Sequence, residues 1–441
     1  MFRKLVIQLS NCAPRKLNVF LKSLEAKLDI MRSELSQAGG AVNRTPLAVA
    51  RFVFCGVAAC QLGGVTLHSF AGIGVGRGSA EDCLTLALSK ENVVKQWKLC
   101  THLIVDEISM VDADFFTKIE YGVLFSVARH IRGDNRPFGG VKLIVTGDFL
   151  QLPPVCGKDE AAKFCFESEA WNRCIKKTVM LERVHRQDDS RFVKVLQEIR
   201  VGKCGDDVYT ALTETKANNF SAEGIVPTRL CTHTADALAV NTHSLEELEG
   251  KHCKIFEAED SQFIPESLRG TVAKRLVLKV NAQVMLMKNI DLSRGLSNGS
   301  RGVVTKFSKK GFPMVKFFST DGEIEVVPIR FAVRLPGCNE PACRRQLPLQ
   351  LAWAISIHKS QGLTLDAVEV SLERVFAEGQ SYVALSRARS LASLRVIAFD
   401  PSAIRANKNV IRYYESIKET AAEEAEEEFI FRKRRKLSAE F

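Results

Sequence analysis

The sequence predicts an α/β protein built on parallel sheets, with a smaller antiparallel β unit inserted into it. Two apolar runs, residues 103–105 and 142–146, end in the polar pairs Asp106-Glu107 and Gly147-Asp148. Strands that are apolar throughout are typical of parallel sheets covered on both faces, and such sheets carry site residues at their carboxyl ends. We therefore expect these two pairs to meet at one edge of a parallel sheet.

A different pattern, with short strands and tight turns, occupies residues 278–333. A glycine completes each of the turn pairs Asn298-Gly299, Lys310-Gly311 and Asp321-Gly322. Turns of this kind join neighbouring antiparallel strands. This part of the chain is expected to form a small β-barrel.

Composition favours a large protein with a polyanionic partner. With 441 residues, 46% of them apolar, the chain can bury several cores and should divide into about two to four domains. A net charge of +11 suits nucleic acid. The 13 cysteines include no C-x-x-C pair, which favours reduced thiols over a zinc site. No apolar run reaches the roughly 20 residues that cross a bilayer, so we expect no membrane association.

Both ends of the chain carry possible targeting signals. Residues 1–24 are basic and contain no acid, which is compatible with a mitochondrial presequence. The apolar spacing within residues 17–28 is equally compatible with a small folded helix. Near the other end, the basic run Arg432-Lys433-Arg434-Arg435-Lys436 reads either as a nuclear import signal or as a solvated tail.

The first acidic pair points to phosphate chemistry. At the carboxyl end of a buried strand, Asp106 can hold Mg²⁺ directly or through water, and Glu107 can polarise an attacking water molecule. The same pair could simply cap a helix. The second strand favours the chemical interpretation, because Gln151 and the stiff Pro153-Pro154 pair follow it and could place an amide beside a γ-phosphate.

Two later segments add phosphate-binding groups. His358, Lys359, Ser360 and Gly362 form a polar cluster between a helix and a strand, which can contact nucleic acid on one side and nucleotide on the other. Further on, Arg387 and Arg389 lie one residue apart. In a helix they would lie on different faces, so one could reach a transferring phosphoryl group.

Together these stretches resemble the Pif-type DNA helicases, a superfamily 1 group with 5′→3′ polarity that is related to RecD. The resemblance runs from about Cys55 to Tyr414. Long matches carry it, at residues 56–60, 67–74, 136–140 and 347–354 as well as around Asp106 and Gln151.

The resemblance implies roles for particular residues. Asp106 and Glu107 would serve Mg²⁺ and water, and Gln151 would sense the γ-phosphate of ATP. Arg186 and Arg387 match the two arginine fingers of such motors. Gly362 lies in a segment that couples DNA to nucleotide. The implied DNA contacts are His68, Phe70, His358, Lys359 and Ser360, although His68 and His358 are equally readable as structural histidines.

It also implies the partners and the layout of the chain. We expect ATP and Mg²⁺ as cofactors, single-stranded, forked and G-quadruplex DNA as partners, a monomer, and a place in the nucleus and the mitochondrion. Two RecA-like domains with an SH3-like insertion are expected, and the second RecA-like domain is discontinuous. The predicted parts are an N-terminal segment at 1–50; a first RecA-like domain at 51–175, with a wedge at about 72–98 that holds a helix over 81–98; a second at 176–245 plus 347–410; the SH3-like barrel at 265–345; and a charged tail at 411–441.

One motif of the family is missing. The phosphate loop G-x-x-x-x-G-K-[ST] does not occur, since Gly157-Lys158, Gly202-Lys203 and Gly250-Lys251 are followed by other residues. Its backbone N–H groups and lysine hold the β- and γ-phosphates, and losing one such donor costs roughly 10²–10³ in rate. We expect poor ATP hydrolysis and, without the strand that carries the loop, unpaired neighbours in the sheet. Two function classes stay open: an ATP-dependent helicase, or a catalytically silent DNA-binding splice variant or truncated product.

Overall fold

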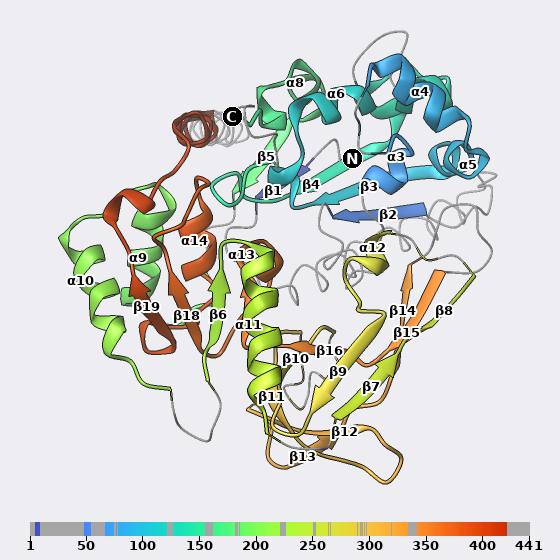
Figure 1. Cartoon of the computed structure of the whole chain (residues 1–441). Coiled ribbons are helices and arrows are strands. Elements are labelled where there is room, and N and C mark those ends of the chain that lie inside the picture. The colour runs from blue at the N-terminus through green and yellow to red at the C-terminus, as the bar shows by residue number, and fades with distance from the viewer. Residues whose placement is uncertain are drawn as a thin grey trace, which may run out of the picture.

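The computed structural model places two parallel sheets side by side, with antiparallel strands below them (Figure 1). It describes the backbone of strands 5–8 and 48–53, and it describes most of residues 67–420. Within 67–420 the gaps are 75, 77, 121–126, 155–161, 181–183, 185, 221–225, 250–252, 263, 265, 289, 292–293, 295, 297, 319 and 334–341. The segments on which the two targeting predictions rest lie outside the described residues.

The first sheet is parallel throughout and has the order β2-β3-β4-β1-β5. Strands β3 and β4 are the two apolar runs that the sequence indicated, and residues 103–105 and 143–146 are buried in them. The α/β prediction is therefore confirmed. The bounds are β1 Leu5–Gln8, β2 Ala48–Val53, β3 Cys100–Asp106, β4 Lys142–Thr146 and β5 Lys177–Met180.

Strand β1 lies between β4 and β5 in this sheet. It pairs in parallel with β4, where Ile7 faces Thr146, and with β5, where Gln8 faces Met180. The expectation that the missing strand would leave unpaired neighbours in the sheet is wrong for β4, because four residues near the N-terminal end of the chain pair with it. Both hydrogen-bonding edges of β4 are used, which is what a buried parallel strand requires.

Among the described residues, helices α3 to α8 pack against the first sheet. Their apolar side chains join the sheet in one core that includes Phe70, Trp97, Phe116 and Trp171. The single helix expected over 81–98 is instead two helices broken at Ser89-Lys90, where the Lys90 ammonium donates to the Gly72 carbonyl (2.6 Å). The bounds are α3 Leu67–Ala71, α4 Ala80–Leu88, α5 Glu91–Leu99, α6 Ala113–Glu120, α7 Val127–Arg132 and α8 Glu169–Cys174.

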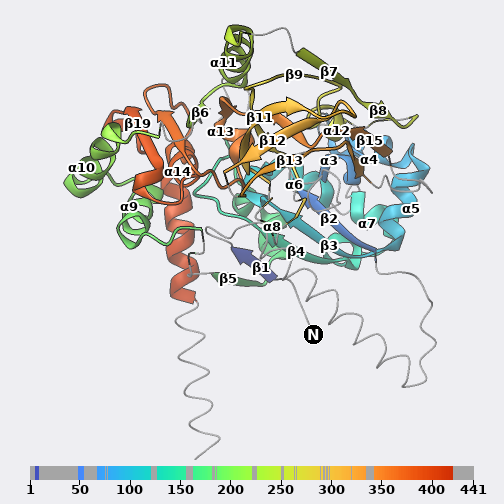
Figure 2. The same ribbon diagram turned by 90° about the horizontal axis from the view of Figure 1, so that it is seen from below.

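The second sheet is also parallel, in the order β17-β6-β18-β19. The apolar faces of α9 and α10 pack on it in a second core. Its strands are β6 Thr228–Cys231, β17 Ala354–Ser356, β18 Val368–Ser371 and β19 Leu394–Ala398. Its helices are α9 Ser190–Arg200, α10 Asp206–Glu214, α11 Thr234–Glu247, α13 Ile357–Ser360 and α14 Gln380–Leu385, and a further helix spans 408–420 (Figure 2).

The remaining strands are antiparallel and enclose a third core. A five-stranded sheet has the order β13-β12-β11-β10-β16, and β14-β15-β8 and β7-β9 lie beside it. All three predicted turn glycines have a positive φ, between 88° and 91°, as tight turns require. The bounds are β7 Cys253–Glu257, β8 Glu259–Asp260, α12 Glu266–Arg269, β9 Arg275–Lys279, β10 Gln283–Leu286, β11 Arg301–Phe307, β12 Pro313–Phe317, β13 Glu323–Glu325, β14 Ile329–Val333, β15 Ala342–Gln346 and β16 Leu349–Leu351.

In the part of the chain that the structure describes, no helix is long and apolar enough to cross a membrane. The eight described cysteines are free thiols, and no group of three or more potential metal ligands is found among the described residues.

Candidate functional site

The candidate site lies where the two parallel sheets face each other. The first sheet contributes Asp106 at the end of β3 and Thr146 at the end of β4. The second contributes Gln361, just after α13, and Arg387, just after α14. The two residues of the first sheet are more than 200 positions away in the sequence from the two of the second. The amide of Gln361 donates to a carboxylate oxygen of Glu107 (3.0 Å), and this hydrogen bond joins the two halves of the site directly.

Asp106 is a half-buried carboxylate with one oxygen already in use. Its Oδ1 accepts a hydrogen bond from the Thr146 hydroxyl and another from the Glu107 backbone N–H (2.9 Å). Burial raises its pKa although both hydrogen bonds oppose this. Among the described residues both bonds use Oδ1, so Oδ2 can take a cation. Carboxylate and hydroxyl oxygens are the donors that Mg²⁺ prefers.

Glu107 has the most unusual environment in the site. Its backbone is in the left-handed region (φ 54°), which is costly for a residue with a Cβ and is found preferentially at functional positions. Burial raises the pKa of its carboxyl to about 8, as does the neighbouring Asp106, whereas Arg387 and Arg186 oppose the rise. A carboxyl with a pKa close to neutrality suits general-base chemistry, because it can take and release a proton.

The two predicted arginine fingers both oppose the rise in the pKa of this carboxyl, Arg186 from the segment before α9 and Arg387 from the turn after α14. Arg186 is 8% exposed and donates to the Thr364 hydroxyl (3.2 Å) and to the Ser386 carbonyl (3.4 Å). Arg387 is 1% exposed and donates to the Val383 carbonyl (2.8 Å). Burial lowers the pKa of Arg387, as does the positive charge of Arg186, so two cations are held close together where an anionic ligand would relieve their repulsion.

The helix expected to carry both late arginines ends before them. Helix α14 stops at Leu385, and Arg387 follows in a turn. Arg389 points elsewhere, since it is 62% exposed and pairs with Asp366 (3.2 Å). The predicted difference between the two arginines therefore holds, although a turn and not a helix produces it.

Behind the carboxylates, a buried network holds the loop that follows β4. Asp148 is fully buried and receives two hydrogen bonds from Arg200 of α9 (2.8 and 3.1 Å) and one from the Tyr414 hydroxyl (3.2 Å). The Gln151 amide also donates to Asp148 (3.4 Å). Burial alone would lower the pKa of Arg200, but Asp148 raises it above its usual value. The predicted sensor Gln151 is thus attached to the second sheet and to helix 408–420.

A glycine brings the second sheet into backbone contact with the same loop. A Cβ on Gly379, which precedes α14, would lie 2.1 Å from the Gln151 carbonyl oxygen and 2.6 Å from that of Leu150. Only a residue without a side chain fits there, and its φ of 73° also favours glycine. A displacement of the Gln151 loop would therefore move α14, which carries the turn to Arg387.

Near the DNA contacts predicted on α13, a groove of about 710 Å³ runs between α11, β9, β16 and α13. Four cationic residues line it, against one acidic residue, Glu246. The predicted contact Lys359 is one of the four, and His358 precedes it on α13. The lining cations are Arg269, Arg275, Lys279 and Lys359.

Two predicted DNA contacts are placed where they cannot reach a strand. Phe70 is 0% exposed, because its ring packs against Trp97 in the core with the centroids 4.5 Å apart. Ser360 is also fully buried, and its hydroxyl donates to the Ile357 carbonyl (2.8 Å). Both assignments are corrected to structural roles. His68 is partly buried beside Phe115, at 4.3 Å, and burial lowers its pKa, so the structural alternative for it also stands.

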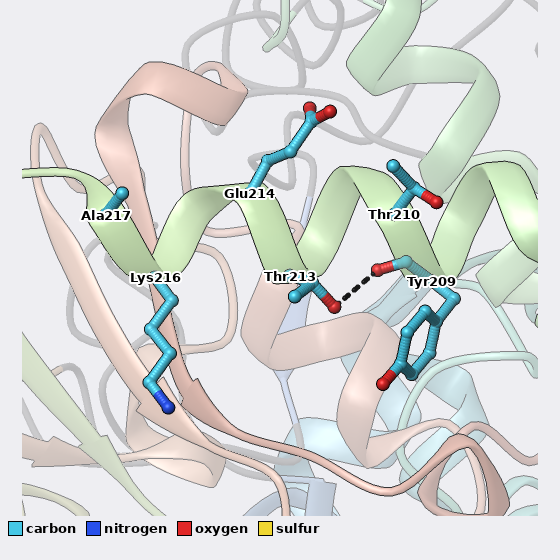
Figure 3. A pocket seen from close by; sticks show the side chains of 6 residues that line it. All are labelled: Tyr209, Thr210, Thr213, Glu214, Lys216 and Ala217. Carbon is cyan, nitrogen blue, oxygen red and sulfur yellow. Dashed lines mark hydrogen bonds between the residues drawn. The ribbon is translucent and has the colours of Figure 1, made fainter.

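A shallow hollow on α10 is separate from this site. It has a volume of about 480 Å³ and is lined by residues from Tyr209 to Ala217. Figure 3 shows Thr210, Glu214 and Ala217 on one side of the ribbon and Tyr209 and Lys216 on the other, and the only bond drawn joins the Thr213 hydroxyl to the Tyr209 carbonyl (2.8 Å). It contains no converging polar groups and is not part of the chemistry.

Several site residues were missed by sequence reasoning. Thr146 ends the predicted strand and Gln361 lies inside the predicted polar cluster, so their segments were signalled although their roles were not. Arg200 and Tyr414 gave no signal, since an arginine at a helix end and a tyrosine in a charged helix normally face solvent. The need for a glycine at position 379 can be recognised only in the structure, where the backbone of Leu150 and Gln151 passes close to it.

Comparison with known proteins relates this chain to a family of known proteins. The PIF1-like helicase family matches residues 35–209, and the 2B domain of DNA helicase Pif1 matches residues 267–307. The ATP-dependent DNA helicase PIF1 of Xenopus laevis is 49% identical over 373 residues, which cover 83% of this chain and 57% of the relative. The chain thus spans little more than half the length of that relative.

Solved structures agree with this similarity. The Pif1 helicase from Candida albicans is 32% identical, with a TM-score of 0.70 over 94% of this chain and 95% of that one. The Bacteroides Pif1 helicase in complex with ADP-AlF3 and single-stranded DNA is 29% identical, with a TM-score of 0.62 over 95% and 94%.

Proposed function

This chain belongs to the PIF1-like helicase family, and we propose that it is an ATP-dependent 5′→3′ DNA helicase. One observation carries the proposal above all. The paired carboxylates of the first sheet and the arginines of the second converge across the interface between the sheets, with the bond from Gln361 to Glu107 joining them. A phosphoryl-transfer motor needs this arrangement, in which opening and closing of the interface is tied to the nucleotide.

We assign the roles of the residues from their positions. Glu107 takes a proton from the attacking water, for which its raised pKa fits it. Arg186 and Arg387 stabilise the charge that develops on the transferring phosphoryl group, and Gln151 reports on that group to the loop beside Gly379. Asp106 and Thr146 are the residues that would hold Mg²⁺, which neutralises charge on the β- and γ-phosphates when bound.

Helix α13 is proposed to couple DNA to hydrolysis. Lys359 on this helix lines the groove, and Gln361, the first residue after the helix, contacts Glu107. A strand that displaces this short helix would therefore move the amide that touches the catalytic carboxyl. Stimulation of hydrolysis by single-stranded DNA follows from this connection.

The proposed DNA path is the groove between α11 and β9. Its four cations match a phosphate backbone, and the overall charge of +11 favours the same ligand. The Bacteroides relative is described in complex with single-stranded DNA. We extend this to forked DNA and G-quadruplexes as substrates, to a monomeric enzyme, and to recombination and repair in the nucleus and the mitochondrion. The division into two RecA-like domains with an SH3-like insertion belongs to the same proposal.

The missing phosphate loop sets the expected rate. Without a G-x-x-x-x-G-K-[ST] sequence, the β- and γ-phosphates lack their usual cradle of N–H groups and lysine, so we expect turnover at least about 10²–10³-fold slower than with the loop in place. Strand β1 restores the sheet but not that sequence. This observation favours a second candidate function, a DNA-binding form without catalysis.

Strand displacement separates the two candidates. A duplex with a 5′ single-stranded tail is incubated with excess chain and ATP, beside a duplex with a 3′ tail and beside the Glu107→Gln variant. The helicase proposal predicts slow, ATP-dependent separation of the 5′-tailed duplex only, and none with Glu107→Gln. Binding of both duplexes without any ATP-dependent separation would support the DNA-binding form instead.

A further inference from the structure

Three aromatic rings gather at the surface beside the groove. Phe376 is 56% exposed, more than the other exposed aromatic residues Tyr209 and Phe318. Its ring lies nearly parallel to that of His358, with 20° between the planes and 6.2 Å between the centroids. The ring of His233 also lies near that of Phe376, with 5.3 Å between the centroids and 34° between the planes. An apolar ring that is more than half exposed contributes little to core packing and is open to contact by a ligand.

The backbone that carries Phe376 is fixed. The N–H groups of Phe376 and Ala377 both donate to the side-chain oxygen of Gln380, which is fully buried (3.1 and 3.3 Å). One residue further on, Glu378 accepts a hydrogen bond from the Asn407 amide (2.8 Å). The ring is therefore presented from a braced loop, and a ligand that covers it would not have to order the loop first.

The cluster adjoins the cationic groove. Thr234, which follows His233 in the sequence, lines the groove, and so does Lys359, which follows His358. The two histidines thus lie directly before residues that line the groove, His233 at the start of α11 and His358 on α13, and the cations of the groove come from α12, β9 and α13. Single-stranded nucleic acid presents that combination of chemistry, with a charged backbone on one side and flat base faces on the other.

We propose that Phe376, together with His358 and His233, is a base-stacking platform for the single strand that runs along the groove. This inference rests on the proposed function and adds to it the residues that hold the bases. Burial lowers the pKa of His358, as does its proximity to His233, so at neutral pH its imidazole is an uncharged ring. Stacking of this kind accepts any base, which suits a motor that must pass over every sequence.

The platform is also connected to the hydrolytic site. Phe376 lies three residues before Gly379, whose backbone is in contact with the Gln151 carbonyl. A base that moves onto or off the ring therefore acts on a short, braced loop whose other end contacts the sensor. Progress along DNA and the state of the nucleotide would share this loop.

The test is equilibrium binding of the full chain to a fluorescein-labelled oligothymidylate of about 15 nucleotides, followed by anisotropy. Phe376→Leu removes the aromatic face but keeps an apolar side chain, and Phe376→Tyr restores the face. Phe318→Leu is the matched control, since Phe318 is exposed but packs on Arg301 away from the groove (5.0 Å). An abasic oligonucleotide of the same length isolates the phosphate contribution.

Base stacking contributes enough to predict a Kd that is roughly 5- to 100-fold weaker for Phe376→Leu. Phe376→Tyr and Phe318→Leu should stay within about threefold of the parent chain, and the abasic strand should bind the parent and Phe376→Leu equally. Tight binding of oligothymidylate by the parent with no loss in Phe376→Leu overturns the platform but leaves the proposed function intact. A parent chain that does not bind the strand at all overturns both.

Discussion

Arg200 holds the sensor loop to the second sheet, and its replacement by methionine isolates that connection. The Asp148 carboxylate is fully buried, and Arg200 supplies two of its hydrogen bonds while itself only 19% exposed. Removing one partner of a buried pair leaves an uncompensated charge and costs roughly 3–5 kcal/mol. Arg200→Met is therefore expected to lower the free energy of unfolding by about that amount.

A control for this change lies on the same helix. Arg191 also forms an ion pair, with Glu214 at 3.0 Å, but both of these side chains are more than half exposed. Such pairs contribute roughly 0–1 kcal/mol, so Arg191→Met should change stability little. Urea unfolding followed by circular dichroism measures both variants. In the double variant with Asp148→Asn, the loss should be smaller than the sum of the single losses, because the buried charge is gone. An Arg200→Met chain as stable as Arg191→Met would refute the assignment.

Three further changes test other parts of the structure. The pKa of Glu107 in the folded chain, about 8, lies above its usual 4.5, so folding favours the protonated carboxyl. The stability that this protonation contributes is lost as pH rises through 8. In thermal unfolding, Glu107→Gln should therefore be more stable than the parent by roughly a few kcal/mol at pH 8.5 and should approach the parent near pH 4.5. Gly379→Ala places a Cβ 2.1 Å from the Gln151 carbonyl oxygen, so it should lower the free energy of unfolding by roughly 1–3 kcal/mol and reduce the stimulation of ATP hydrolysis by DNA. The control is Gly322→Ala, which has a similar φ and open space around it and should cost about 1 kcal/mol only. Val6→Pro removes a backbone hydrogen bond of β1, which lies between β4 and β5, and should destabilise the first sheet by roughly 3 kcal/mol or more. Unchanged urea unfolding would exclude β1 from the sheet.

The candidate catalytic residues were predictable from the sequence because they follow recognisable apolar strands. Asp106 and Glu107 follow an apolar strand, and a parallel sheet brings such ends together whatever the helices do. Gln151 and the arginines could be found through the resemblance to a known family. What no local pattern contains is the pairing across the interface, since Arg200 and Tyr414 lie 52 and 266 residues from Asp148.

The DNA side was less predictable, for a reason that Phe70 illustrates. An aromatic residue next to a histidine in a matched motif suggests stacking, but which face of a five-residue helix meets the core is decided by tertiary packing, here against Trp97. Phe376 shows the converse, because nothing in its sequence context separates it from a core residue. Strand β1 was also not foreseen, since three apolar residues and a glutamine can belong to a helix as readily as to a strand.

Single-stranded-DNA-stimulated ATP hydrolysis by the 441-residue chain, beside its Glu107→Gln variant, is the most direct test of the site. If Glu107 is the base held between the two sheets, the parent hydrolyses ATP slowly, DNA raises the rate, and Glu107→Gln abolishes it while single-stranded DNA binding is unchanged. A parent chain that binds DNA but hydrolyses ATP no faster than Glu107→Gln contradicts the helicase assignment and identifies a DNA-binding form.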